Sequence, residues 1–184
     1  MTYYGNKELA ESFRTVRKNT IAVAEDIPED KYGFRPTPDS RSVAELLRHI
    51  AVTATGHYDM YAIKKMTSFV GFDWGAYMQK AQQEEQKLQT KAQILQALRS
   101  GGEQWATYVG SAPEAELERL ITFSESSVPP AKSRFETLLS VKEHEMHHRG
   151  QLMVIERLLG IVPHLTRERQ ARMAPPAAAK KAGA

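Results

Sequence analysis

The chain has 184 residues, of which 41% are hydrophobic and 26% charged, a composition typical of one globular domain with a buried core. It contains no cysteine, which excludes disulfides and cysteine-ligated metal sites, so any metal must bind to histidine or to oxygen ligands. No signal peptide and no apolar run of the roughly 20 residues needed for a membrane span are visible. We therefore expect a soluble, cytoplasmic protein that has no membrane partner.

The apolar residues repeat with a helical period and predict four long amphipathic helices. The first is expected to begin near Asn6 and to end near Ile27, before a loop rich in Pro, Asp and Ser. Each of the others begins at a capping box, in which two side chains satisfy free backbone N–H groups at the start of the helix. These pairs are Ser42 with Glu45, Thr90 with Gln93 and Ser133 with Glu136.

The segments between these helices are predicted as connections. The second helix is expected to reach about Lys65, and the aromatic stretch MTSFVGFDWGAYMQ after it to form a short helix or a loop. The sequence Ser100-Gly101-Gly102 is expected to kink or interrupt the third helix. Residues 111–132 are expected to form a connector with a short extended piece, and the fourth helix is expected to stop at Gly160.

Four such helices predict an all-α fold, an up-down-type four-helix bundle with long connecting loops. We assign this domain to residues 1–163 and expect residues 164–184 to form a flexible, disordered tail rich in Ala, Pro and basic residues. The end of the tail, ARMAPPAAAKKAGA, accounts for the formal net charge of +3. The rest of the chain is close to neutral, which speaks against nucleic-acid binding.

Three of the six histidines lie in the segment HEMHHRGQ, residues 144–151, on the fourth helix. His144 and His148 are one turn apart and project to the same side, and His49 lies on the expected inner face of the second helix. Three converging imidazoles would form a His₃ site for a divalent metal with a position left for water or substrate. The expected inward seam of the fourth helix is Thr137, Val141, His144, His148, Gln151, Ile155 and Leu158.

The alternative is that these histidines are structural and hydrogen-bonded. Burying several imidazoles without a common partner costs about 1–3 kcal/mol each, and one shared metal removes that cost. Gln151 is expected to orient a ligand or a bound water. His147 lies at the edge of the apolar arc, His57 is expected to lie in a pocket or on the surface, and His164 is expected to be exposed.

Residues 144–148 also satisfy H-E-x-x-H, the zinc motif of metallopeptidases in which Glu145 would be the general base. Such peptidases usually take a third ligand downstream, where only Glu156 and Glu168 are available. Glu145 also lies about 100° round the helix from His144, off the seam. This reading is kept as a less favoured alternative.

The segments RPTPDSRSVAELLRHIA (35–51) and HEMHHRGQL (144–152) resemble the DinB-like (DinB/YfiT) superfamily, over roughly residues 5–163. The resemblance implies a four-helix bundle and a divalent-metal site with His49, His144 and His148 as ligands, whereas His147 matches a non-ligand histidine. It also implies a homodimer. The superfamily includes metal-dependent thiol S-transferases and a maleylpyruvate isomerase that use low-molecular-weight thiols, and many members with no assigned reaction.

Two hypotheses about function follow. The first is a metal-dependent transferase or hydrolase that activates a small thiol or water for reaction with a small-molecule substrate, with Glu45, Tyr61 or Tyr108 as acid–base candidates. The second is a non-catalytic metal-binding or stress-response protein in which the metal is structural. Three imidazoles suit zinc, nickel or iron(II), and the sequence does not choose among them.

Overall fold

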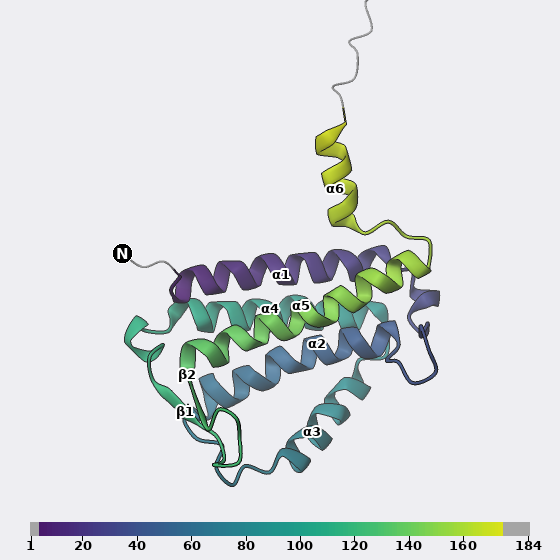
Figure 1. Cartoon of the computed structure of the whole chain (residues 1–184). Helices are drawn as coiled ribbons and strands as arrows, with labels where there is room; N and C mark the ends of the chain where they lie inside the picture. The colour runs from purple at the N-terminus through teal and green to yellow at the C-terminus, as the bar shows by residue number, and fades with distance from the viewer. Residues whose placement is uncertain (1–3, 175–184) are drawn as a thin grey trace, which may run out of the picture.

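The computed structural model describes residues 4–174, which form six α-helices and one small antiparallel sheet. Figure 1 shows α1, α2, α4 and α5 side by side, with α3 outside them next to α2. None of the described helices is both long and apolar enough to cross a membrane. The elements are α1 (Asn6–Asp26), α2 (Val43–Tyr58), α3 (Trp74–Lys87), α4 (Lys91–Ser111), β1 (Leu120–Thr122), β2 (Ala131–Ser133), α5 (Arg134–Leu158) and α6 (His164–Met173).

The three predicted capping boxes are confirmed and set the starts of α2, α4 and α5. At α2, the Ser42 N–H donates to Glu45 Oε2 at 2.8 Å, and the Glu45 N–H donates to Ser42 Oγ at 3.3 Å. A π-helical turn, Asp59–Ile63, continues α2 to within two residues of the predicted end. The predicted end of α5 is also confirmed, since Gly160 follows it with a φ of +78°.

The core consists of two apolar clusters at opposite ends of the four long helices. One is formed mainly by the second half of α1, the first halves of α2 and α4 and the second half of α5, and the other by the remaining halves. Between them lies a polar layer. Here Arg17 of α1 and Glu145 of α5 form a buried ion pair, with Arg17 Nη2 and Glu145 Oε2 2.8 Å apart.

The predicted interruption of the third helix is wrong, because α4 runs without a break through Gly101 and Gly102. The two glycines instead allow neighbouring side chains to approach. A Cβ on Gly101 would lie 2.9 Å from Thr55 Oγ1 of α2, and one on Gly102 would lie 2.8 Å from Arg17 Cγ of α1. Gly102 therefore makes room for Arg17 to reach the polar layer, and Gly101 makes room for Thr55.

The prediction of an all-α fold is corrected by the β1–β2 sheet, in which Leu120 pairs with Ser133 and the buried Ile121 pairs with Lys132. The sheet uses the short extended piece expected in residues 111–132. The aromatic stretch that follows α2 joins this sheet, since the Phe69 N–H donates to the Thr122 carbonyl oxygen at 2.7 Å. The stretch then leads into α3, which is longer than the short helix or loop that we predicted.

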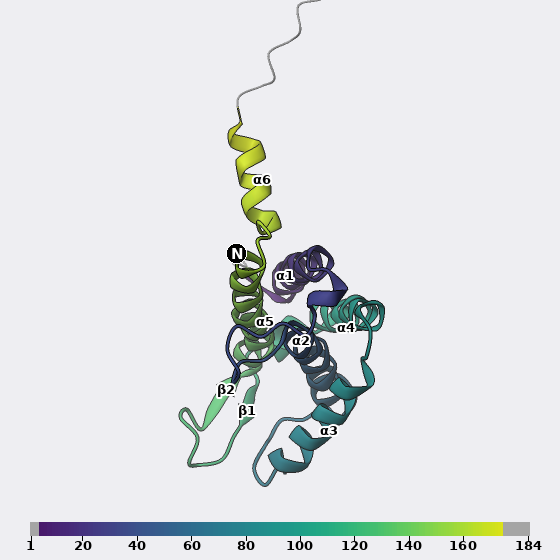
Figure 2. The same cartoon turned by 90° about the vertical axis from the view of Figure 1, so that its right-hand side faces the viewer.

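The predicted flexible tail is also corrected in part, because its first ten residues form α6. His164, which was expected to be exposed, is buried and lies with Nε2 3.2 Å from Asn19 Oδ1 of α1. This contact anchors the start of α6, and the rest of the helix extends away from the other helices (Figure 2). The remainder of the predicted tail, residues 175–184, lies outside the described residues.

The inward seam of α5 is rotated from the predicted one. Gln151 and Leu158 are exposed, whereas Leu138, Glu145 and Leu152 are buried. The prediction placed Glu145 off the seam because it lies about 100° round the helix from His144, and the ion pair with Arg17 is what allows its charge inside. This rotation moves His144 and His148 from the centre of the seam to its edge, where both are half-buried.

Glu156 of α5 is fully buried, with 0% exposure, and neither carboxylate oxygen has a hydrogen-bond partner within residues 4–174. Burial, and after it the charge of Asp26, raises the pKa of Glu156 from 4.5 to about 7. An acid whose pKa is raised by folding binds more protons in the folded chain than in the unfolded chain. The contribution of Glu156 to the free energy of unfolding therefore falls as the pH rises from about 4.5 to about 7.

We predict that Glu156→Gln raises the stability at pH 8, by about 1–3 kcal/mol, because an unpaired buried charge is removed. The gain over wild type should shrink below pH 7 and vanish near pH 4.5, which urea unfolding across this range would measure. Glu168→Gln on the exposed part of α6 is the control and should show no such trend. A gain that stays constant with pH would contradict the assignment.

Candidate metal centre

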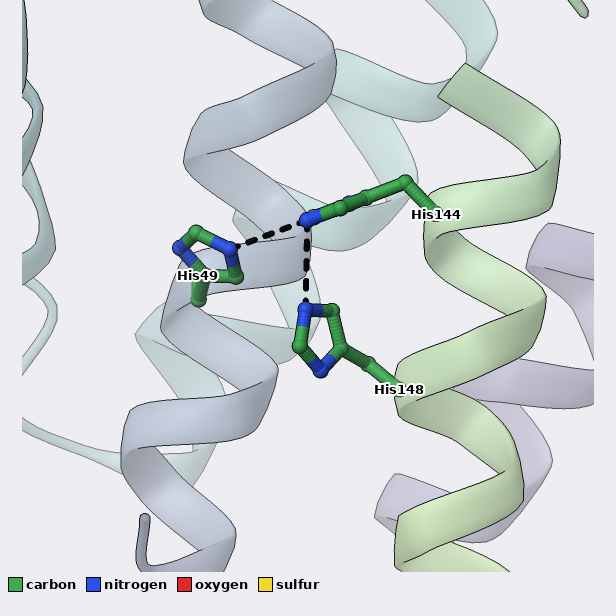
Figure 3. Close-up of side chains that lie close together, drawn as sticks. All are labelled: His49, His144 and His148. Atoms are coloured by element: carbon green, nitrogen blue, oxygen red, sulfur yellow. Dashed lines mark hydrogen bonds between the residues drawn. The ribbon is translucent and has the colours of Figure 1, made fainter. Parts of the chain in front are cut away.

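His49 of α2 and His144 and His148 of α5 point toward one another across the space between the two helices (Figure 3). His144 Nε2 lies 3.0 Å from His49 Nε2 and 3.1 Å from His148 Nε2. The predicted convergence of these three side chains is therefore present in the structure. It arises because residues 144 and 148 are one helical turn apart and α5 packs beside α2 with His49 at the same level.

The hydrogen bonds on the far side of two rings determine what the Nε2 atoms present to the centre. His49 Nδ1 lies 3.0 Å from Glu85 Oε1, and His148 Nδ1 lies 2.9 Å from Gln151 Oε1. Both partners are oxygen acceptors, so each Nδ1 carries a proton, and in a neutral ring of this tautomer Nε2 carries the lone pair. A neutral His144 has one ring proton and can satisfy only one of the two Nε2–Nε2 contacts.

A cation satisfies all three nitrogen atoms at once. Nitrogen ligands about 2.0–2.1 Å from a tetrahedral ion lie about 3.3–3.4 Å apart, which is close to the 3.0 and 3.1 Å from His144 Nε2 to the other two, and the ligand atoms of all three rings lie within 4.8 Å of one another. Among the described residues, these three form the one group of histidine and acidic side chains close enough to share an ion. The cluster can therefore hold a metal.

The protonation states also suit metal binding, which requires neutral imidazoles. Burial, followed by the neighbouring His148 and His49, lowers the pKa of His144 to about 3. Burial lowers the pKa of His148 as well. Near neutral pH these two rings are uncharged and their lone pairs are available.

The cluster is open to solvent on two sides. A cavity of about 1030 Å³ is bordered by His49 and His144, with its walls formed by α2, α3 and α5. A second cavity, of about 580 Å³, is bordered by His49 and His148. A small molecule can therefore reach the ring nitrogens from the larger cavity without any rearrangement of the four long helices.

The other predicted residues take different places around the cluster. Gln151 Oε1 is bonded to His148 Nδ1, and its Nε2 lies 3.3 Å from Nε2 of the exposed His147. Glu45 and His57 both line the larger cavity. Glu45 is held by the capping box and by Arg35, whose hydrogen bond lowers the pKa of the Glu45 carboxyl group.

Neither tyrosine proposed as an acid–base group borders this cavity. The Tyr108 hydroxyl donates to the Tyr61 carbonyl oxygen at 3.0 Å and accepts from Arg134 Nη1 at 2.8 Å. Burial raises the pKa of both tyrosines, which keeps them protonated. The two residues support the end of the helices near the sheet.

Glu85 is the residue at this site that sequence reasoning missed. It lies on α3, and our prediction left the polar stretch QKAQQEEQKLQ outside any long helix. The available signal was the N-cap residue Asp73, whose side chain accepts from the Ala76 N–H at 2.8 Å. A helix that begins there carries Glu85 to His49.

The H-E-x-x-H alternative is not supported by the position of Glu145. Its carboxylate accepts from Arg17 Nε at 2.9 Å and 3.1 Å and from Arg17 Nη2 at 2.8 Å, on the face of α5 that turns toward α1. The Arg17 Nη1 group donates to the Leu98 carbonyl oxygen at 2.6 Å. The carboxylate is fully used in this buried pair and has no route to a substrate in the cavity.

We predict that Glu145→Gln destabilises the protein by on the order of 3 kcal/mol, because it leaves the buried Arg17 guanidinium without its counter-charge. Urea unfolding at pH 7 measures the change. Glu143→Gln on the exposed face of α5 is the matched control, and it should change the stability by less than about 0.5 kcal/mol. A general base of a peptidase would show the opposite pattern, with wild-type stability retained in Glu145→Gln.

The chain is similar in sequence and in fold to known proteins. The family model described as the DinB superfamily matches residues 12–152. The uncharacterized protein YjoA of Bacillus subtilis (strain 168) is 25% identical over 155 residues, covering 84% of this chain and 91% of the relative. The crystal structure of a DinB-like protein, YjoA from Bacillus subtilis, superposes with a TM-score of 0.58 at 21% identity, over 83% of this chain and 92% of that one.

Proposed function

The chain belongs to the DinB superfamily, whose members are metal-binding in general, and we propose that it is a metalloenzyme acting on a small molecule. His49, His144 and His148 are the proposed ligands of one divalent ion. The observation that supports this most directly is the convergence of three Nε2 atoms, 3.0 and 3.1 Å apart, at the border of an open cavity. We also propose that the four long helices, α1, α2, α4 and α5, form an up-down four-helix bundle.

The proposed reaction is a transfer or a hydrolysis in which a small thiol or water is the nucleophile. A divalent ion lowers the pKa of either one and so supplies a nucleophile near neutral pH. The chain has no cysteine, so a thiol would be a low-molecular-weight cosubstrate. Zinc, nickel and iron(II) are all compatible with three imidazole ligands.

The cavity supplies groups for the rest of the reaction. His57 Nδ1 lies 2.9 Å from the Thr53 carbonyl oxygen and must donate to it, so His57 Nε2 has a free lone pair. Burial lowers the pKa of His57 and keeps it neutral. We propose that this Nε2 accepts a proton from the nucleophile. Two arginines and two glutamates, Arg41, Arg48, Glu45 and Glu85, also line the cavity, so their formal charges balance.

The first test of this proposal is metal content. His49→Ala, His144→Ala and His148→Ala should each reduce bound metal from one ion per chain to below a tenth of that value, because two imidazoles hold an ion far more weakly than three. His147→Ala is the matched control and should keep the full content. Elemental analysis after zinc loading and dialysis, with circular dichroism to verify folding, measures both. Full occupancy in the first three variants would contradict the ligand assignment.

The second test is turnover. Metal-loaded protein is screened with pairs of thiols and electrophiles and with a panel of esters and amides, and the metal-free protein and His144→Ala serve as controls. We expect metal-dependent product formation from at least one thiol pair or hydrolysable substrate. Bound metal that raises the Tm, without turnover on any substrate, would favour the alternative of a structural metal.

We also propose that the protein is a homodimer. Light scattering on the same samples measures its oligomeric state.

A further inference from the structure

α3 is attached to the remaining helices in an unusual way. None of the residues of α3 is buried, although the helix has 14 residues. Tyr77, Ala81 and Glu85, at a spacing of four, lie toward α2, and α3 is outside the four long helices in both views (Figures 1 and 2). A helix of this length is marginal in isolation, so α3 depends on its docking against α2.

Two cavities flank the docked face of α3. The larger cavity beside the histidine cluster lies on one side, and a cavity of about 740 Å³ lies on the other. Val52, Tyr77 and Ala81 border both of them, so α2 and α3 meet along a narrow strip. Because no residue of α3 is buried, undocking of α3 requires less free energy than global unfolding.

Three contacts hold this strip together. The Tyr77 hydroxyl packs against Gly56, where a Cβ would collide with it. The Arg48 Nε–H of α2 donates to the carbonyl oxygen of Leu88, the residue after α3, at 2.6 Å. The third is the bond between His49 Nδ1 and Glu85 Oε1 at 3.0 Å, which alone among the three reaches a proposed metal ligand.

We propose that Glu85 is a positioning residue that couples metal binding to the docking of α3. This inference rests on the proposed metal site. The Glu85 carboxylate accepts the Nδ1 proton of His49, which fixes the tautomer with a lone pair on Nε2 and holds the ring in its orientation. A carboxylate in this position strengthens the imidazole as a ligand, and its removal typically costs 10–100-fold in metal affinity.

The coupling is reciprocal. A cation at His49 Nε2 withdraws electron density from the ring, which makes the Nδ1–H a stronger donor to Glu85 and favours docked α3. By linkage, docked α3 must then favour metal binding to the same extent. Docked α3 also forms one wall of the larger cavity, so metal loading favours the form of the protein in which this cavity is complete.

The test compares wild type, Glu85→Gln and Glu84→Gln. Glu84 is the matched control, since it neighbours Glu85 on α3 and is bonded to Lys87 at 2.7 Å rather than to a histidine. Zinc affinity is measured by competition with a chelator, and amide hydrogen exchange of residues 74–87 is measured with and without zinc. Tm values of the metal-free proteins verify that both variants fold.

We expect Glu85→Gln to weaken zinc binding by about 10-fold or more, and Glu84→Gln to leave it within about 2-fold of wild type. Zinc should slow exchange in residues 74–87 of wild type and of Glu84→Gln, and this protection should be reduced in Glu85→Gln. Wild-type zinc affinity in Glu85→Gln, or exchange of α3 that zinc does not change, would overturn the coupling and leave the metal site intact. Failure of wild type itself to bind metal would overturn the coupling together with the proposed function.

Discussion

The buried ion pair between Arg17 and Glu145 determines how α5 is rotated, and the position of the histidine cluster depends on that rotation. Taking two charges out of water is costly unless both are fully hydrogen-bonded, and here the guanidinium is bonded to both carboxylate oxygens and to the Leu98 carbonyl oxygen. Successive residues of a helix are about 100° apart. With Glu145 directed toward α1, the preceding His144 is directed toward His49 of α2.

This arrangement places two kinds of polar group at the same level of the molecule, between two apolar clusters. On the α1 side the charges neutralise each other and need no further partner. On the α2 side three imidazoles face one another through their Nε2 atoms, 3.0 and 3.1 Å from the central His144 Nε2. The Arg17–Glu145 pair needs no partner from outside the protein, whereas the three imidazoles can hold a cation. We therefore treat the ion pair as structural and the histidine cluster as the candidate site.

Much of this could be predicted from the sequence where the signal is local. The capping boxes at Ser42, Thr90 and Ser133 gave the starts of three helices correctly, because a helix N-terminus is determined by residues a few positions apart. The spacing of His144 and His148 indicated a common direction for the same reason. The resemblance to the DinB superfamily, which the match over residues 12–152 confirms, also indicated His49, His144 and His148 as ligands.

The parts that were wrong or missed depend on contacts between distant residues. Glu145 was placed outside the seam from its angle to His144, and its burial could not be foreseen because its partner Arg17 is 128 positions away. Gly101 and Gly102 were expected to break a helix, whereas the side chains that need their space come from α1 and α2. Glu85 could not be assigned, because its role exists only once α3 is docked beside His49.

The central claim is that one ion binds to the three Nε2 atoms, and X-ray absorption spectroscopy of the zinc-loaded protein tests it most directly. The account predicts three imidazole nitrogens about 2.0–2.1 Å from the zinc, with the outer-shell scattering of the rings and a fourth, lighter ligand from outside the protein. A spectrum with only oxygen ligands and no imidazole scattering would contradict it.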